Sequence, residues 1–511
     1  MISTARLRRA VRRETVGVDI LAALNVVGAV LKYLSAAFVF PVAVALWYDE
    51  TPTPFLVAAA VGGLGGWAIE RATHGKERVG AREGFLIVAL TWVLVAALGA
   101  IPYMLSGEKQ ISRPLDAYFE AMSGFTTTGA SVLTDIPGLS RSMLMWRQFS
   151  QWLGGMGIIV LALAILPRLR VGGRQLFESE APGPEVEQLA TTIRNTARRM
   201  WLLYVILTVL MIAILAAFAE WGVDDKMTLY DAVAHPLSTL PTGGFSPRAR
   251  NFEEFGAASQ WTATVFMLLA GTNFALLYAA FRQRRPGSLV RDDEFRLYIA
   301  ILVVATVSVT AILAGEGLFE SEAAVRHAAF QVVTTMTTTG YASTDFAVWP
   351  VLAAAGLVGL MFIGGCAGST SGSIKVVRHL LVGRTLRREL DQTVHPELVS
   401  PLRLNRVVAD ERVVRAVSVF VLLYVGLFAV GTLALMVDAA ASDLALTPFQ
   451  AIAAAATTLG NVGPGFGFAG PMGSFEPFGD ASKATMILLM WLGRLEIIPV
   501  VVLFTKGYWR A

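Results

Sequence analysis

The chain has 511 residues, of which 55% are hydrophobic and 16% are charged, and its mean hydropathy is +0.59. These values exclude an ordinary soluble protein, and the small net charge of +4 argues against nucleic-acid binding. A single cysteine, Cys366, excludes an intrachain disulfide, and the five histidines lack the spacing of a transition-metal site. Several apolar stretches of ~20 residues are long enough to cross the hydrocarbon core of a bilayer, so we expect an all-α membrane protein.

Two apolar spans come first, at about 25–48 and 55–69, behind a basic N-terminal arm that we expect to lie in the cytoplasm. The rest of the chain divides into four units, each with a spanning segment, a half-length segment and a second spanning segment. We expect these segments at 84–105, 114–126 and 148–166; at 201–218, 229–240 and 261–281; at 295–313, 323–337 and 351–382; and at 414–436, 448–459 and 485–505. The expected organisation is an arm with two extra transmembrane helices (1–83), followed by four M1–pore loop–M2 repeats (84–170, 171–285, 286–390 and 391–511) in a pseudo-four-fold arrangement.

A short phrase that ends in glycine follows each half-length segment. The four phrases are Thr127-Thr128-Gly129, Pro241-Thr242-Gly243, Thr338-Thr339-Gly340 and Asn461-Val462-Gly463. A ring of backbone carbonyls can replace the water around a dehydrated cation, and glycine permits the backbone angles that such a ring requires. The carbonyl end of each half-length helix would also favour a cation. One copy is as consistent with an ordinary turn, but four copies predict a single ion pathway.

The positions of the arginines predict the orientation in the membrane. The arginine-rich connections at 168–199, 282–291 and 378–406 all fall on the side of the N-terminal arm if each span crosses once, and the positive-inside rule makes that side the cytoplasm. A unit of two crossings and a re-entrant loop returns to its starting side, so four such units are parallel and can surround one axis. This count favours a channel-like pore over the inverted repeats of many transporters.

The second span of unit three is interrupted by glycines and hydroxyl residues. Residues 364–373 read GGCAGSTSGS and precede Lys375, so we expect two half-helices joined by a loop inside the membrane, with no such break in the other second spans. The segment lacks the Gly-Lys-Ser/Thr of a phosphate-binding loop, and glycines that only permit close helix packing are the alternative interpretation. Arg494 lies within the last span, where an arginine should face the interior and have partners. Lys375 would add to a positive constriction there.

Four segments resemble the selectivity-filter segments of the Trk/Ktr/HKT superfamily of potassium transporters: FEAMSGFTTTGAS, LPTGGFSP, QVVTTMTTTGYAS and TTLGNVGPGFG. The two extra N-terminal spans and the last segment are similar to the TrkH branch. The resemblance implies K⁺ as the transported ion, because all four filter positions are glycine, while Pro241 and Pro464 depart from the pattern of the other copies. It also implies a gate contacted by Arg494 and formed by Gly364, Gly365, Gly368, Ser369, Gly372 and Lys375.

The same resemblance implies a homodimer in the inner membrane and a cytosolic nucleotide-binding regulatory subunit of the TrkA type. We expect no cofactor besides the transported ion. An enzyme is disfavoured because no nucleophile with a base and no carboxylate or histidine cluster occurs at membrane depth. A Na⁺-permeable or H⁺- or Na⁺-coupled cation symporter on the same scaffold is the alternative function.

Overall fold

The computed structural model describes residues 18–75, 80–169, 186–281, 284, 286–398, 400–405 and 407–510, with only the backbone for 81, 158–169 and 186–194. Helices form nearly all of the regular structure of these residues, and the one sheet found there pairs β1 (Arg403–Leu404) with β2 (Val407–Val408). Six helices in the described part are long and apolar enough to cross a membrane, and two bent helix pairs meet the same criterion when each pair is taken as one span.

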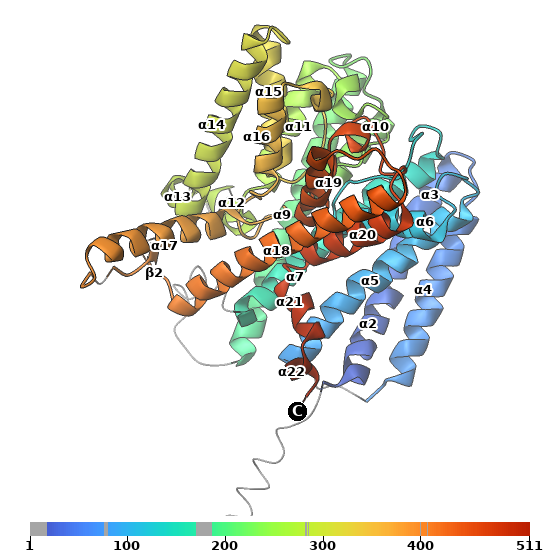
Figure 1. Ribbon diagram of the computed structural model, residues 1–511. Coiled ribbons are helices and arrows are strands. Elements are labelled where there is room, and N and C mark those ends of the chain that lie inside the picture. Colours follow the sequence, from blue (N-terminus) through green and yellow to red (C-terminus); the bar gives the residue numbers. More distant parts are fainter. Residues whose placement is uncertain are drawn as a thin grey trace, which may run out of the picture.

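The two N-terminal spans pack tightly against each other and against the first helix of unit one. The first span consists of α2 (Ile20–Leu34), η1 (Ser35–Phe38) and α3 (Val39–Trp47), and the second is α4 (Thr53–Ala72). Figure 1 shows α2 and α4 side by side, next to α5. Glycines permit this approach, because a Cβ on Gly66 would lie 2.5 Å from the carbonyl oxygen of Gly28 and a Cβ on Gly28 would lie 2.9 Å from that of Gly66.

Four units follow, each built from a long helix, a half-length helix and a second long segment. Unit one contains α5 (Ala81–Leu105), α6 (Pro114–Phe125) and α7 (Arg141–Leu169). Unit two contains α9 (Val186–Glu220), α10 (Leu229–Thr239), η2 (Asn251–Glu254), α11 (Ala257–Ala270) and α12 (Phe274–Phe281), and the short α13 (Gly287–Arg291) leads out of it. Unit three contains α14 (Asp293–Gly315), α15 (Ser321–Met336), η3 (Phe346–Val348), α16 (Val351–Leu360) and α17 (Val376–Val394). Unit four contains α18 (Glu411–Ala441), α19 (Pro448–Gly460), η4 (Gly467–Ala469), α20 (Asp480–Arg494), α21 (Ile498–Val501), η5 (Val502–Phe504) and α22 (Lys506–Trp509).

Local sequence explains where three of the four half-length helices begin. Pro114 occupies the first turn of α6, where its missing N–H costs nothing. Thr228 and Thr447 precede α10 and α19, and each forms a reciprocal capping box with the third residue of its helix. At ~1.5 Å per residue these helices of 11 to 16 residues are ~17 to 24 Å long, too short to cross the ~30 Å hydrocarbon core, as the sequence predicted.

The second spanning segment is broken in units two, three and four, and only α7 of unit one runs through. The helices α11 and α12 meet at 105°, and α20 meets the helical segment 498–504 at 112°. The expectation of a break in unit three alone is therefore wrong. In unit two, Gly271 lets the chain turn against unit three, because a Cβ there would lie 2.6 Å from Cγ2 of Thr337. In unit four, Glu496 and Ile497 both have φ of 60°, and Pro499 starts a new helix.

The break in unit three is the longest of the three and agrees with the prediction. Helix α16 ends at Leu360 and α17 begins at Val376, so residues 361–375 form a non-helical loop. Beyond this loop α17 extends away from the body of the protein (Figure 1). The loop itself remains within the protein and lies against the ends of the half-length helices.

Candidate functional site: a ring of four loops and the loop beneath it

The four half-length helices end in the same hydrogen-bonding pattern. At each end an N–H donates to the carbonyl five residues earlier, at 2.8 to 2.9 Å, and the residue just before that N–H is left-handed, with φ of 52° to 57°. This is the Schellman arrangement of a helix C-terminus. The donating residues are Thr128, Gly243, Thr339 and Val462, and the left-handed residues are Thr127, Thr242, Thr338 and Asn461.

Three of the four left-handed residues are threonines, which is unusual. A β-branched side chain crowds this conformation, and each such residue costs of order ~1–3 kcal/mol unless its surroundings enforce it. The same strained threonine conformation occurs three times, at Thr127, Thr242 and Thr338. Strain of this kind concentrates at functional sites, so its repetition marks these loop ends as the candidate site.

A glycine follows in every loop and closes the four loops into a ring. Gly129, Gly244, Gly340 and Gly463 have φ of 86°, 79°, 80° and 114°. A Cβ on each would collide with the carbonyl oxygen of the next unit: 2.2 Å from Gly243, 2.0 Å from Thr339, 1.9 Å from Val462 and 2.7 Å from Thr128, respectively. The ring glycine of each unit thus faces a carbonyl of the next unit, and the glycine of the fourth unit faces a carbonyl of the first. This cyclic pattern is the pseudo-four-fold arrangement that the sequence predicted.

The second loop has a different register from the one expected. The glycine that matches Gly129, Gly340 and Gly463 is Gly244, while Gly243 matches Thr128. Pro241 therefore corresponds to Thr126 and Thr337 in the helix end, and it does not replace a threonine or asparagine of the ring. The double glycine left the register ambiguous. The aromatic residue that directly follows both Gly244 and Gly340 was the signal that would have resolved it.

Side chains brace the ring from behind. The hydroxyls of Thr126 and Thr128 lie 2.7 Å apart, and those of Thr337 and Thr339 lie 2.8 Å apart. The side-chain amide of Asn461 donates to Oγ1 of Thr128 at 2.9 Å, which ties the fourth loop to the first. All of these groups are buried, where such hydrogen bonds fix a single arrangement.

The loop of unit three lies against the ring. The N–H of Gly372 donates to Oγ1 of Thr338 at 2.7 Å, and the hydroxyl of Thr370 donates to the carbonyl of Leu240 at 2.9 Å. On the side of unit two, the N–H of Cys366 donates to the carbonyl of Gly271 at 2.8 Å. The loop therefore contacts the ends of the half-length helices of units two and three directly.

The glycines expected in this loop are needed for close backbone contacts. A Cβ on Gly364 would lie 2.2 Å from the carbonyl oxygen of Gly372, and a Cβ on Gly372 would lie 2.4 Å from that of Gly460. A Cβ on Gly365 would lie 2.5 Å from the carbonyl oxygen of Gly271. Gly368 has φ of 73°, and the neighbouring Ser369 donates its hydroxyl to the carbonyl of Cys366 at 2.6 Å. Larger residues at Gly364, Gly365 and Gly372 would break close contacts within the loop and with the units around it.

One buried and one partly buried cation donate hydrogen bonds to carbonyls of the loop. Arg494 is the last residue of α20 and only 2% exposed, and its Nη1 donates to the carbonyl of Thr370 at 2.8 Å. Lys375 donates from Nζ to the carbonyl of Ser371. Glu496 pairs with Arg378 at 2.6 Å. Within the described residues, Nε and Nη2 of Arg494 have no hydrogen-bond partner.

The TrkH family model, described as a cation transport protein, matches residues 55–509. This chain belongs to the TrkH family. Members of the TrkH family that resemble it over nearly their whole length include the potassium uptake protein TrkH of Salmonella typhimurium, 37% identical over 495 residues, or 95% of this chain and 98% of that protein. The potassium uptake protein TrkG of Escherichia coli is 33% identical over 92% of this chain and 95% of its own length.

A solved TrkH structure has the same fold. The crystal structure of the potassium transporter TrkH from Vibrio parahaemolyticus matches with a TM-score of 0.85 and 34% identity, and the match covers 96% of this chain and 100% of that one. The predicted all-α membrane fold is thereby confirmed. Membership of a family of transport proteins also confirms that the chain is not an enzyme.

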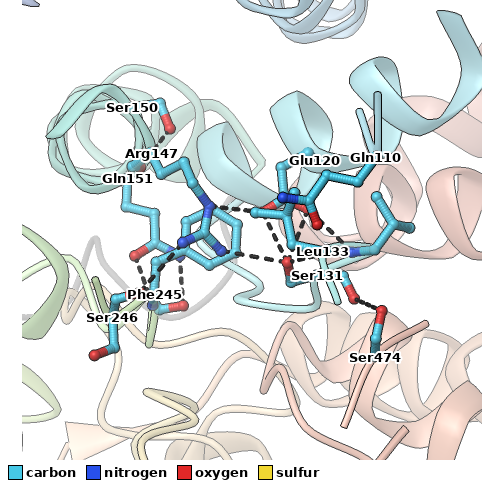
Figure 2. Close-up of polar contacts among 12 residues, drawn as sticks. Gln110, Glu120, Ser131, Leu133, Arg147, Ser150, Gln151, Phe245, Ser246 and Ser474 are labelled. Carbon is cyan, nitrogen blue, oxygen red and sulfur yellow. Dashed lines mark hydrogen bonds and ion pairs between the residues drawn. The ribbon is translucent and has the colours of Figure 1, made fainter. Parts of the chain in front are cut away.

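One buried ion pair of this TrkH-family chain was not predicted. Arg147 of α7 and Glu120 of α6 are paired at 2.8 Å, with side-chain exposures of 1% and 0%. Figure 2 shows how the pair links two loops: Glu120 accepts the hydroxyl of Ser131, and Arg147 donates to the carbonyl of Ser246 at 3.2 Å. Arg147 also stacks on the ring of Phe245 at 4.2 Å. The available signal was an arginine directly before an apolar span and a glutamate within a half-length segment.

The contact between loop and ring leads to a first prediction. Changing Thr338 to valine keeps the β-branched shape and removes the acceptor of the Gly372 N–H. On the expectation that this loop is the gate, the loss of about 1 kcal/mol from its position against the ring should raise ion flux roughly fivefold. The rise is measured as K⁺ flux into liposomes that contain the variant or the wild-type protein.

Thr242→Val is the matched control for Thr338→Val. Thr242 occupies the same left-handed position of the second loop, but within the described part of the chain its hydroxyl bonds only the carbonyl of Pro241. Equal flux changes in the two variants would show that the hydrogen bond to Gly372 does not hold the loop.

Proposed function

We propose that this chain takes up K⁺ across the inner membrane through the ring formed by the four loops. The observation that carries the proposal is the closed cycle in which each ring glycine faces the carbonyl oxygen of the next unit. Such carbonyls supply the oxygen ligands that a dehydrated alkali cation requires. The potassium uptake proteins TrkH and TrkG, which are relatives of this chain, support K⁺ as the ion. No cofactor other than the transported ion is proposed.

The ring residues of this proposal are those of the observed register. They are Thr127, Thr128 and Gly129; Thr242, Gly243 and Gly244; Thr338, Thr339 and Gly340; and Asn461, Val462 and Gly463. Each half-length helix ends at the ring, so its negative dipole end favours a cation there. The side-chain hydrogen bonds behind the ring support a fixed ring diameter. A fixed diameter is what discrimination among alkali cations requires.

We propose that the loop of residues 361–375 is the gate. Its contacts with Leu240 and Thr338 support a closed position directly beneath the ring. Arg494, which is buried, and Lys375, which is partly buried, add two positive charges at the loop, and a cation would meet repulsion there until the loop moves. Opening would require breaking the hydrogen bond from Arg494 to Thr370.

The assembly and the orientation are further parts of the proposal. A homodimer and a cytosolic nucleotide-binding regulatory subunit of the TrkA type follow from the family resemblance, and the N-terminus is placed in the cytoplasm. The arginines of α17, which include Arg384 and Arg388, support this orientation. They lie after the last apolar segment of unit three, and arginines between spans are enriched on the cytoplasmic side of a membrane. A partner that pulls on α17 would act on the gate, since α17 begins directly after it.

One observation favours a second candidate, a Na⁺-permeable or H⁺- or Na⁺-coupled symporter. The corner of the ring at Gly463 is looser than the others, because its added Cβ would lie 2.7 Å from the nearest carbonyl and the other three would lie 1.9 to 2.2 Å away. A ring with unequal corners should discriminate less sharply than a symmetric one. Fluxes of K⁺ and Na⁺, with and without a proton gradient, separate the two functions.

Rescue of K⁺-limited growth tests the proposed function. We expect the wild-type chain to support growth of a strain without its own K⁺ uptake systems, and we expect Gly129→Ser to abolish this rescue at low K⁺. The serine would place a Cβ 2.2 Å from the carbonyl oxygen of Gly243. Rescue that is indifferent to this substitution, at equal amounts of protein in the membrane, would contradict the role of the ring.

A further inference from the structure

The second loop of the ring lacks a side chain that the other loops have. The position before the ring glycine carries Thr128, Thr339 and Val462 in units one, three and four, but Gly243 in unit two. The φ of Gly243 is not positive, so its backbone would accept a side chain. What excludes one is a neighbour, because a Cβ on Gly243 would lie 2.4 Å from Cδ of Gln151.

Gln151 comes from a different unit and occupies this space. It lies on α7 of unit one, next to Arg147, and Figure 2 shows both side chains pointing toward the segment around Phe245 and Ser246. The side chain of Gln151 is fully buried. A buried amide that is hydrogen-bonded at both ends has a fixed orientation. The amide of Gln151 is therefore as rigid as the threonine or valine side chain that stands at this position in the other units.

Both ends of the amide hold the second loop. The Nε2 of Gln151 donates to the carbonyl of Gly243 at 2.6 Å, and its Oε1 accepts the N–H of Phe245 at 3.1 Å. The two bonds flank Gly244 on either side along the chain. Among the described residues, no protein donor bonds the matching carbonyls of Thr128, Thr339 and Val462. The carbonyl of Gly243 is thus the one ring oxygen there that a side chain orients.

We propose that Gln151 is a selectivity-determining positioning residue: it replaces the missing side chain at Gly243 and sets the direction of that carbonyl in the ring. This inference rests on the proposed function of the ring as a cation filter. With the amide present, the second corner is held at a fixed distance from the other three. Without it, the carbonyl of Gly243 is free to follow a smaller ion, and discrimination against Na⁺ falls.

The test is the K⁺/Na⁺ permeability ratio of purified protein in liposomes, because a ratio does not depend on the amount of folded protein. We expect Gln151→Leu, which has a similar size and no hydrogen-bonding groups, to lower the ratio about tenfold, equivalent to ~1.4 kcal/mol. Gln148→Leu is the matched control. Gln148 lies one turn earlier on α7, is also fully buried, and has no partner for its amide within the described residues, so the ratio should not change.

A double substitution provides a second, independent test of the role of Gln151. Gly243→Thr alone should collide with Gln151 and abolish transport. Combined with Gln151→Ala it restores a β-branched side chain at the position of Thr128, Thr339 and Val462, so transport and selectivity should return to at least a third of the wild-type values. A double variant no better than Gly243→Thr, or a ratio unchanged in Gln151→Leu, would overturn the inference.

Gly244→Ser separates this inference from the proposed function. That substitution places a Cβ 2.0 Å from the carbonyl oxygen of Thr339 and touches the ring directly. If Gly244→Ser lowers the ratio and Gln151→Leu does not, the role of Gln151 is wrong and the filter stands. If Gly244→Ser also leaves the ratio unchanged, the ring is not the filter and both proposals fail.

Discussion

Serine in place of Gly340 is expected to remove K⁺ selectivity almost completely, whereas the same change at Gly463 should have the smallest effect of the four ring positions. A Cβ at Gly340 would lie 1.9 Å from the carbonyl oxygen of Val462, and one at Gly463 would lie 2.7 Å from that of Thr128. The left-handed backbone adds roughly 1–2 kcal/mol of strain for any residue with a side chain. Together these costs should displace the ring carbonyls and lower the K⁺/Na⁺ permeability ratio of Gly340→Ser by about tenfold or more.

The order of the four effects distinguishes this account from a general disturbance of the fold. Reversal potentials under K⁺ and Na⁺ gradients give the ratio for each serine variant. Gly340→Ser and Gly244→Ser should be most affected, Gly129→Ser slightly less, and Gly463→Ser least, following the distances of 1.9, 2.0, 2.2 and 2.7 Å. Gly356→Ser is the control, because a Cβ there meets nothing within 4 Å. A ratio lowered as strongly in Gly356→Ser would contradict the explanation.

Shortening Arg494 to alanine is expected to raise ion flux about tenfold or more. The guanidinium is buried at the end of α20, and its hydrogen bond to the carbonyl of Thr370 connects it to the gate loop. A hydrogen bond from a charged group contributes ~1.5–3 kcal/mol, so the closed position should lose much of its stability. The same substitution removes a positive charge from the pathway of a cation. Flux of Rb⁺ into liposomes, corrected for the amount of protein inserted, measures the effect.

The Arg494 variant should still fold. Burial of a charge carries a desolvation cost of several kcal/mol, and within the described residues two of the nitrogens of Arg494 have no partner to offset it. Arg494→Lys is the comparison, because it keeps the charge and loses the fork that reaches Thr370, and its flux should be intermediate. Flux in the alanine variant at or below the wild-type level would show that Arg494 does not hold the gate closed.

The sequence predicted the features that repeat or that stand out from their surroundings. Gly129 and Gly340 follow the same three threonines, and Arg494 is a charge within an apolar span, so both kinds of residue could be singled out. The half-length helices followed from the short apolar segments that precede the four glycine phrases. These signals are local, and each needs only a few neighbouring residues.

Features that depend on contacts between units were missed. Gln151 meets Gly243 across 92 positions of the chain, and Gly271 turns because Thr337 of the next unit lies against it. The register of the second loop was misassigned for the same reason, since Gly243 and Gly244 differ only in which of them faces the carbonyl of Thr339. Local sequence patterns cannot reveal these contacts, because they form only when the four units pack together.

The most direct measurement of the central claim is the position of a bound heavy alkali-like cation. Crystals of the protein grown with Tl⁺ in place of K⁺ should show anomalous density on the axis enclosed by the carbonyls of Thr128, Gly243, Thr339 and Val462, and Na⁺ at the same concentration should leave that density weaker or absent. Anomalous density only elsewhere, with none among these four carbonyls, would contradict the claim that the loops form the cation filter.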